Sequence, residues 1–198
     1  MTKIKICGLT SENDIEAVNA VKPDYAGFVF AESRRQVTPE LARKLRALLD
    51  PGIIPVGVFV NAAPDTINGL FNSGVIQYAQ LHGGESEEYI YKLRERGIPI
   101  IQAIRDGRGD TISDYANYHL FDAKQGGGGT VFNWDNLPDT GKAFFLAGGI
   151  GLHNIQAALK LQPYAIDISS GAETDGIKNA EKIKQLVAAC RGEARLAR

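Results

Sequence analysis

Residues 144–171 read FFLAGGIGLHNIQAALKLQPYAIDISSG, and they contain one complete unit of the pattern that organises the chain. An apolar run at Phe144–Ala147 leads through a glycine-rich turn into a helical stretch at His153–Leu161. A second apolar run follows at Ala165–Ser169. Short runs that are almost continuously apolar are typical of parallel strands buried on both faces. The unit therefore predicts two parallel strands connected by a helix.

The same alternation extends back to the N-terminus. Further strands, rich in β-branched and aromatic residues, are predicted at Ile4–Cys7, Tyr25–Phe30, Ile54–Val60, Tyr78–His82, Ile100–Arg105 and His119–Asp122. Capping residues or early prolines indicate further helices, which run from Ser11 to Val21, Thr38-Pro39 to Leu49, Ala63-Pro64 to Phe71, Ser86 to Arg96 and Asn179 to Arg191. The stretch after the fifth strand, Asp106–Tyr118, offers at most a helical turn around Thr111–Tyr115.

Eight strands in alternation with helices leave two architectures, an open doubly wound sheet or a closed barrel. The 198 residues give about 25 residues to each of eight units, and eight is the strand number of the (β/α)8 or TIM barrel. No linker separates two complete cores. We therefore predict an α/β chain whose residues 1–198 form a single, compact (β/α)8 barrel with a reduced fifth helical unit.

The composition excludes several classes of protein. A formal net charge of −1 gives no electrostatic reason to expect nucleic acid or an anionic membrane as a partner. No apolar run approaches the roughly 20 residues that cross a bilayer, and the N-terminus lacks the features of a signal peptide. Two cysteines cannot form a disulfide framework, and no Cys/His cluster has metal-ligand spacing. We expect a cytoplasmic protein, a monomer with a homodimer as the alternative.

In a (β/α)8 barrel the active site forms at the C-terminal ends of the strands. Two glycine-rich turns close the last two predicted strands, Gly148-Gly149 and Ser169-Ser170-Gly171. Glycines let the backbone approach a ligand closely, and the amides at a helix N-terminus favour an anion. Two such turns on adjacent strands predict a phosphate site. The alternative is that these glycines merely permit tight turns.

Cys7 and Asp122 also end predicted strands. A thiol with an ordinary pKa near 8.5 is only a few per cent ionised at neutral pH, so a basic Cys7 needs a nearby cation. Lys5 shares the face of Cys7 by strand alternation, and we predict that Lys5 is paired with Asp167 on the neighbouring last strand. Asp122, as an acid, needs a pKa raised well above the ordinary value of about 3.9. The alternative for Asp122 is a helix cap or a turn carboxylate.

Three other polar side chains belong to the same mouth. Arg35 follows the second strand, and its fork of donors suits a carboxylate, although a solvated loop charge is the alternative. Gln80 and His82 share one face of the fourth strand, so His82 is either a hydrogen-bonding wall residue or a catalyst. Cys190, late on the last helix, lies at the opposite end of the barrel from Cys7, and no disulfide is expected between them.

Several strand ends belong to longer motifs, which occur in the order Lys5-Ile6-Cys7-Gly8, Gly27-Phe28-Val29-Phe30, Ser33-Arg34-Arg35, Val56-Gly57-Val58-Phe59-Val60, Gln80-Leu81-His82-Gly83, Phe121-Asp122, Gly127-Gly128-Gly129-Thr130 with Phe132 and Trp134, Leu146-Ala147-Gly148-Gly149-Ile150, and Asp167-Ile168-Ser169-Ser170-Gly171-Ala172-Glu173. Together they resemble the phosphoribosylanthranilate isomerase family over nearly the whole chain. Glycine pairs at strand ends occur in many phosphate-binding barrels. The combination of the Lys-Ile-Cys-Gly, Gln-Leu-His-Gly and Asp-Ile-Ser-Ser-Gly motifs is much more specific.

The resemblance implies an isomerase of tryptophan biosynthesis that rearranges a phosphorylated aminosugar, N-(5'-phosphoribosyl)anthranilate, to 1-(2-carboxyphenylamino)-1-deoxyribulose 5-phosphate. It implies that Cys7 is the general base and Asp122 the general acid of this Amadori rearrangement, and that Arg35 holds the anthranilate carboxylate. No metal and no organic cofactor are implied. The remaining substrate-binding residues would be His82, Gly148, Gly149, Ser169, Ser170 and Gly171.

The chain departs from the family at two places. Gln36 stands where the family often has tyrosine, and Gly176-Ile177-Lys178-Asn179 stands where it usually has Lys-Asp; we interpret the second as structural drift. The nearest enzyme alternative is the related sugar isomerase of histidine biosynthesis, which has aspartate at the position of Cys7. Dual specificity stays open, and a catalytically silent sensor barrel is the alternative of another class. Gly126–Gly129 would suit a mobile flap.

Overall fold

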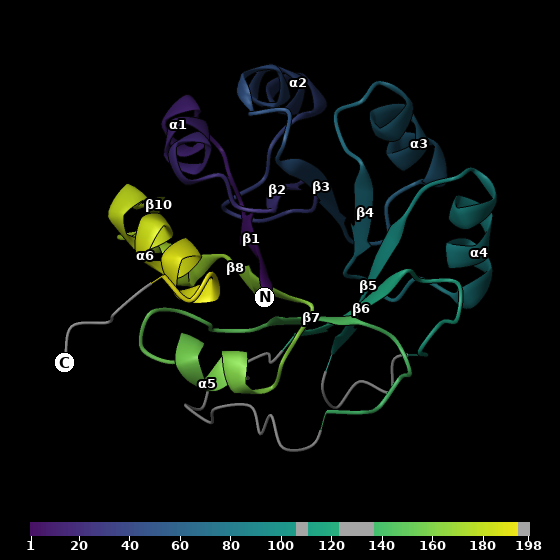
Figure 1. Ribbon diagram of the computed structural model, residues 1–198. Coiled ribbons are helices and arrows are strands. Elements are labelled where there is room, and N and C mark those ends of the chain that lie inside the picture. Colours follow the sequence, from purple (N-terminus) through teal and green to yellow (C-terminus); the bar gives the residue numbers. More distant parts are fainter. Residues whose placement is uncertain (106–110, 123–136, 194–198) are drawn as a thin grey trace.

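The computed structural model describes residues 1–105, 111–122 and 137–193. Eight parallel strands form a closed barrel in sequence order, and the last strand pairs with the first (Figure 1). The predicted barrel is therefore confirmed and the open sheet is excluded. The predicted Gly126–Gly129 flap, Phe132 and Trp134 lie outside the described residues. The strands are β1 (Lys3–Cys7), β2 (Tyr25–Val29), β3 (Ile54–Phe59), β4 (Tyr78–Leu81), β5 (Ile100–Arg105), β6 (Tyr118–Asp122), β7 (Phe144–Ala147) and β8 (Ala165–Ile168).

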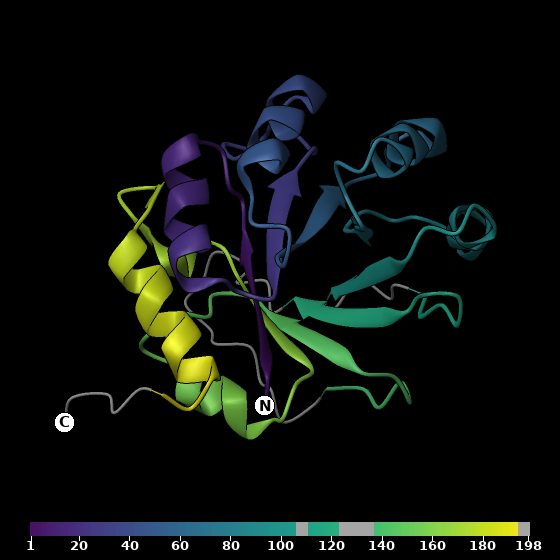
Figure 2. The ribbon, with the colours of Figure 1, turned by 45° about the horizontal axis from the view of Figure 1, so that its top comes forward.

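Helices surround the barrel, and the views in Figures 1 and 2 place α1 and α6 side by side, where they contact each other. The predicted caps are present: Ser11 accepts from the backbone of Asp14, and Asn179 accepts from the backbone of Lys182. Thr38 and Ser86 cap their helices in the same way. The helices are α1 (Glu12–Val21), α2 (Pro39–Leu48), α3 (Pro64–Asn72), α4 (Glu87–Glu95), α5 (Ile155–Lys160) and α6 (Ala180–Cys190).

Two hydrophobic clusters explain why the strands are apolar on both faces. Phe145, Leu120 and Val56 belong to a cluster inside the barrel. Their strand neighbours Leu146 and Phe121 belong to a second cluster that packs against the helices. Because side chains alternate along a strand, strands such as β6 and β7 supply both clusters. The continuous apolar runs in the sequence are the result.

Four tyrosines close the end of the barrel opposite the carboxyl ends of the strands. Tyr25, Tyr78 and Tyr118 begin β2, β4 and β6, and Tyr164 directly precedes β8. The hydroxyl of Tyr164 lies 3.1 Å from that of Tyr25 and 3.2 Å from that of Tyr118. Inside such a barrel, side chains from alternate strands usually pack in layers of four. This tyrosine floor leaves the opposite end as the place for a ligand.

The reduced fifth unit is confirmed for residues 111–117, which form no helix between β5 and β6. Gln102 on β5 anchors this segment: its amide donates to the backbone oxygen of Thr111 at 2.8 Å and accepts from the backbone of Ser113 at 2.9 Å. The buried His119 on β6 adds a second anchor, with ring nitrogens 3.2 Å from the backbone oxygen of Ser113 and 2.8 Å from the hydroxyl of Thr140. These polar contacts hold residues 111–117 against the barrel, where other units of the fold have a helix.

Burial of His119 makes the stability of the fold sensitive to pH. Burial lowers the pKa of His119 below its ordinary value of 6.5. The unfolded chain therefore binds a proton below about pH 6.5 more readily than the folded chain, and stability should fall as the pH decreases through this range. His119→Asn should show a shallower decrease in the urea midpoint between pH 7.5 and 5.

The exposed His153 supplies the control, because His153→Asn should keep the wild-type slope. If the two variants gave the same slope, burial of the His119 ring would not be the cause.

Candidate active site

A cavity of about 270 Å³ lies at the carboxyl ends of the strands. It is lined by most of the residues that the sequence predicted, together with the apolar Val29 and Val58. Gly171 does not line the cavity but follows the lining residue Ser170. The structure thus brings together Cys7, Arg35, His82, Asp122, Gly148, Gly149, Ser169 and Ser170.

Cys7 ends β1 above a buried ion pair. Lys5 Nζ lies 3.0 Å and 2.9 Å from the two carboxylate oxygens of Asp167, and both side chains are buried. The two residues are direct partners in the pairing of β1 with β8. The predicted Lys5–Asp167 pair is therefore confirmed, and it joins the strand that carries Cys7 to the strand that carries Ser169.

The charge state of Cys7 depends on opposing influences. Burial raises the pKa of the Cys7 thiol, and Lys5 lowers it by a smaller amount, so the net direction is upward. The expected cation is present, but it does not outweigh burial. Lys178, which no local sequence pattern connects with this site, also lowers the pKa of Cys7. Cys7 and Cys190 are both buried, and no disulfide joins them, as predicted.

Asp122 ends β6 and contacts His82 across the barrel. His82 Nε2 lies 2.9 Å from Asp122 Oδ2, and the side chains are 23% and 16% exposed. On its other side, His82 Nδ1 lies 3.2 Å from the amide nitrogen of Gln80. Gln80 and His82 share one face of β4, as predicted, and they form a polar chain that ends at the carboxylate of Asp122.

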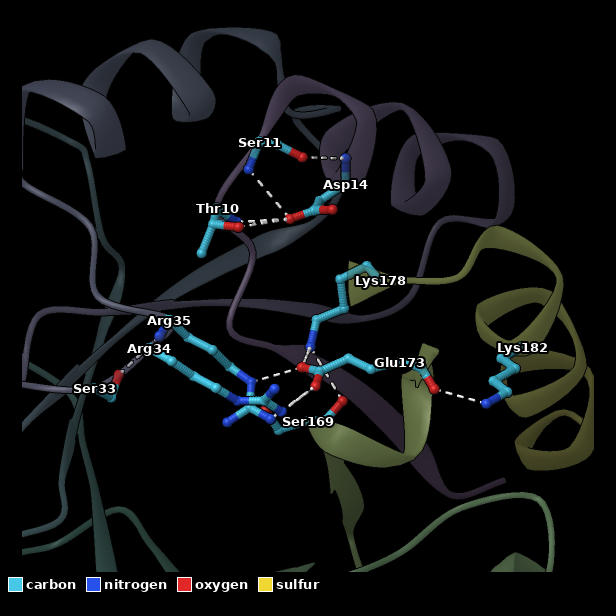
Figure 3. A network of polar contacts seen from close by, with 10 residues as sticks. All are labelled: Thr10, Ser11, Asp14, Ser33, Arg34, Arg35, Ser169, Glu173, Lys178 and Lys182. Carbon is cyan, nitrogen blue, oxygen red and sulfur yellow. Dashed lines mark hydrogen bonds and ion pairs between the residues drawn. The ribbon is translucent and has the colours of Figure 1, made fainter. Parts of the chain in front are cut away.

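Arg35 is held by a carboxylate that sequence reasoning had not singled out (Figure 3). Its Nε and Nη2 lie 2.6 Å and 2.9 Å from the two carboxylate oxygens of Glu173. Arg34 and Lys178 also contact Glu173, at 2.6 Å and 2.7 Å. Burial of Glu173 favours its neutral form, but hydrogen bonds from Arg35 and Lys178 outweigh burial and lower the pKa of Glu173 to about 2. Glu173 is therefore ionised and fixes the guanidinium of Arg35.

Glu173 and Lys178 lie on a short antiparallel ribbon of β9 (Glu173–Thr174) and β10 (Ile177–Lys178), which follows the 3-10 helix η2 (Ser170–Ala172). Lys178 Nζ is buried and also donates to the backbone oxygen of Ser169 at 3.1 Å. The interpretation of residues 176–179 as structural drift was therefore wrong, because Lys178 is part of the site's architecture. The Asp175-Gly176 dipeptide, with φ of 52° and 83°, is the local hairpin signal that could have indicated the ribbon.

Gln36, the other departure, has a defined role in its loop. Its amide nitrogen donates to the backbone oxygen of Phe30 at 3.1 Å, and its backbone forms an isolated bridge with Val29. These contacts return the loop that carries Arg35 to the end of β2. Glutamine at this position therefore supports the loop without an aromatic ring.

The two glycine-rich turns contact each other. Gly148 and Gly149 have φ of 90° and 63°, which form the tight turn after β7. A Cβ at Gly171 would lie only 2.0 Å from the backbone oxygen of Ile150, so only glycine fits where the turns meet. The backbone N–H groups of Gly149, Ser170 and Gly171 donate to no acceptor in the described part of the chain. Unpaired amides on two abutting turns are a suitable environment for an anion.

The described residues offer neither a metal site nor a membrane-spanning helix. No group of three or more His, Cys, Asp or Glu side chains in residues 1–105, 111–122 and 137–193 is arranged to hold a metal ion. Within the same ranges, no helix is long and apolar enough to cross a membrane. The cavity at the barrel mouth is the place where the predicted site residues meet.

The closed barrel and the polar cavity at its mouth define a (β/α)8-barrel enzyme. The family model described as N-(5'phosphoribosyl)anthranilate (PRA) isomerase matches residues 4–189. A protein from Endomicrobium trichonymphae named N-(5'-phosphoribosyl)anthranilate isomerase is 46% identical over 194 residues, covering 94% of this chain and 97% of that protein. The chain belongs to the N-(5'-phosphoribosyl)anthranilate isomerase family.

Two solved structures extend the comparison. A phosphoribosyl anthranilate isomerase in complex with reduced 1-(o-carboxyphenylamino)-1-deoxyribulose 5-phosphate matches with a TM-score of 0.79 at 30% identity, covering 97% of this chain and 100% of that chain. Monomers generated from the dimeric enzyme of Thermotoga maritima match with a TM-score of 0.78 at 31% identity, with the same coverage of 97% and 100%. Both similarities span the entire barrel.

Replacing Glu173 by glutamine tests the ion network. Ionised Glu173, with its pKa lowered from 4.5 to about 2, stabilises the folded state above pH 4.5, and this contribution is lost as the pH falls towards 2. Glu173→Gln should lower the free energy of unfolding at pH 7 by roughly 2 to 3 kcal/mol. It should also flatten the loss of stability between pH 4.5 and 3, measured by urea unfolding.

Glu88 provides a matched control, since it forms an exposed pair with Lys92. Glu88→Gln should leave the unfolding midpoint nearly unchanged, because exposed pairs contribute little. Equal effects of the two substitutions would contradict a special role for Glu173.

Proposed function

We propose that the barrel mouth converts N-(5'-phosphoribosyl)anthranilate to 1-(2-carboxyphenylamino)-1-deoxyribulose 5-phosphate, with Cys7 as general base and Asp122 as general acid. Membership of the isomerase family supports the reaction, an Amadori rearrangement in tryptophan biosynthesis. The residue assignment depends on one observation: a thiol and a carboxyl at two strand ends line the same cavity. Membership of a family of isomerases also argues against the alternative of a catalytically silent sensor barrel.

The reaction needs one proton donor and one proton acceptor. Asp122 protonates the ring oxygen of the ribofuranose, the bond from this oxygen to C1' breaks, and a protonated Schiff base forms. Cys7 as thiolate then removes the proton from C2', which gives an enolamine that tautomerises to the ketone product. Each transfer by a positioned side chain contributes typically 10²- to 10⁴-fold. The positive charges of Lys5 and Lys178 favour the thiolate against its burial.

The substrate carries two anionic groups that need separate partners. We assign the phosphate to the abutting turns at Gly148-Gly149 and Ser169–Gly171, whose free amides support this assignment. We assign the anthranilate carboxylate to Arg35, which Glu173 holds in a fixed orientation. His82 contributes to the wall of the cavity and holds the carboxyl of Asp122. A substrate anchored at both ends would present C2' between acid and base.

Three wider features are part of the same proposal. We propose one domain over the whole chain, since strands from both ends of the sequence complete one barrel. A cytoplasmic location is supported by two buried, free thiols. A monomer is supported by exposed apolar side chains that lie on separate elements of the described part of the chain, such as Leu48 on α2 and Ile177 on β10. A homodimer is the alternative, which sedimentation equilibrium would reveal.

Turnover assays on two variants test the catalytic assignment. Loss of anthranilate-type fluorescence from freshly made phosphoribosylanthranilate reports the reaction directly. Cys7→Ser and Asp122→Asn should each lower kcat by at least about 10²-fold, since each removes one proton-transfer group. Both proteins should retain wild-type circular dichroism.

Cys190→Ser is the matched control, because Cys190 is a buried thiol on α6 outside the cavity. It should turn over at the wild-type rate. Activity that survived in Cys7→Ser would overturn the base assignment, and an unchanged rate in Asp122→Asn would overturn the acid assignment. Absence of turnover in folded wild-type protein would overturn the proposed reaction.

A further inference from the structure

Gln80 is a buried glutamine in the wall of the active-site cavity. The side chain is 2% exposed, yet its amide oxygen, Oε1, has no hydrogen-bond partner in the described part of the chain. An apolar side chain of similar size would avoid this unsatisfied group, so stability does not explain a glutamine here. Its amide nitrogen does have a polar contact, His82 Nδ1 at 3.2 Å.

The strands on either side offer Gln80 no other polar partner. Its register partners are Val58 on β3 and Ile101 on β5, and both side chains are apolar and buried. The contact with His82 is therefore the polar interaction that can explain a glutamine at this position. The reversed amide would leave both N–H donors without an acceptor, whereas the present orientation leaves one N–H donor and the oxygen unpaired, and an unpaired buried N–H is the rarer case in proteins.

The contact determines where the proton of His82 lies. Because an amide nitrogen only donates, the orientation of Gln80 in this structure makes His82 Nδ1 the acceptor, without a hydrogen. A neutral imidazole then holds its proton on Nε2, because the bond made by one ring nitrogen sets the state of the other. Nε2 lies 2.9 Å from Asp122 Oδ2, and it therefore donates to the carboxyl of Asp122.

We propose that Gln80 is a positioning residue that holds His82 in the Nε2–H tautomer and so keeps a hydrogen-bond donor on the acid of the reaction. This proposal rests on the proposed role of Asp122. In the other tautomer, Nε2 would offer a lone pair, accept the proton of Asp122 and compete with the substrate for it. With Nε2–H, His82 does not accept the proton of Asp122, and the donated hydrogen bond makes Asp122 a stronger acid towards the ring oxygen. As Asp122 ionises in the transition state, His82 stabilises the charge that develops.

Nitrogen NMR of the imidazole rings reads this tautomer directly. In ¹⁵N-labelled wild-type protein, His82 should show a protonated Nε2 and an unprotonated Nδ1, with the signals assigned by their absence in His82→Asn. Gln80→Leu removes the donor, and His82 should then show a mixture of both tautomers. Gln80→Glu offers only acceptors, and Nδ1 of His82 should become protonated.

Kinetics and stability separate positioning from a structural role. Gln80→Leu should lower kcat by about 10- to 100-fold, a range typical of a displaced catalytic group, with KM changed less than twofold. Its thermal midpoint should equal or exceed that of the wild type, because the unsatisfied oxygen is removed. Gln80→Glu should have a lower kcat than Gln80→Leu, since it favours the unproductive tautomer.

Gln102→Leu is the matched control, because it removes a buried glutamine whose two hydrogen bonds go to Thr111 and Ser113. It should lower the thermal midpoint and leave the His82 signals and kcat unchanged. A wild-type His82 protonated on Nδ1, or an unaltered tautomer in Gln80→Leu, would overturn the proposal. An active Asp122→Asn would instead remove its catalytic consequence, while the NMR signals would still report the Gln80–His82 contact.

Discussion

The ion pair of Lys5 and Asp167 lies at the seam where the first and last strands close the barrel. A lone buried charge is very costly, so each partner requires the other, and the pairing of β1 with β8 keeps the two within 2.9 Å. Cys7 stands two residues above the lysine and Ser169 two residues above the aspartate. The thiol and one glycine-rich turn are consequently positioned by a single strand-to-strand contact. Any change that opened the seam would separate them.

A second ion network begins where the first ends. Glu173 gathers Arg34, Arg35 and Lys178, and Lys178 also contacts the backbone of Ser169. The two networks meet at the end of β8. Each supplies one cation that acts on the thiol of Cys7: Lys5 lies inside the barrel, and Lys178 lies on the ribbon that follows β8. Their positive charges oppose the burial that raises the pKa of Cys7. The thiol of Cys7 is thus buried away from water but lies near two positive charges that favour its ionised form.

Local patterns in the sequence were sufficient for the strands, the helix caps and the closed barrel. Strand alternation and barrel order also predicted the Lys5–Asp167 pair, because β1 and β8 must be neighbours. The partner of Arg35 could not be predicted, since Glu173 is distant in sequence and reaches Arg35 through a ribbon that only the short Asp175-Gly176 turn indicates. The contact of His82 with Asp122 joins β4 and β6, which are not adjacent strands. Strand alternation predicts that both side chains point into the barrel mouth, but it does not predict that they lie within hydrogen-bond distance of each other.

Barrel closure in sequence order has a consequence for synthesis on the ribosome. The seam joins side chains that are 162 positions apart, so β1 has no second neighbour until Asp167 and the rest of β8 have been made. The ribbon that restrains Arg35 emerges later still. Nascent chains released early would contain Cys7 and Asp122 but neither the seam nor Glu173. Contacts of such long range slow folding and leave strand edges exposed, so the unfinished barrel depends on protection from aggregation until its final strand is available.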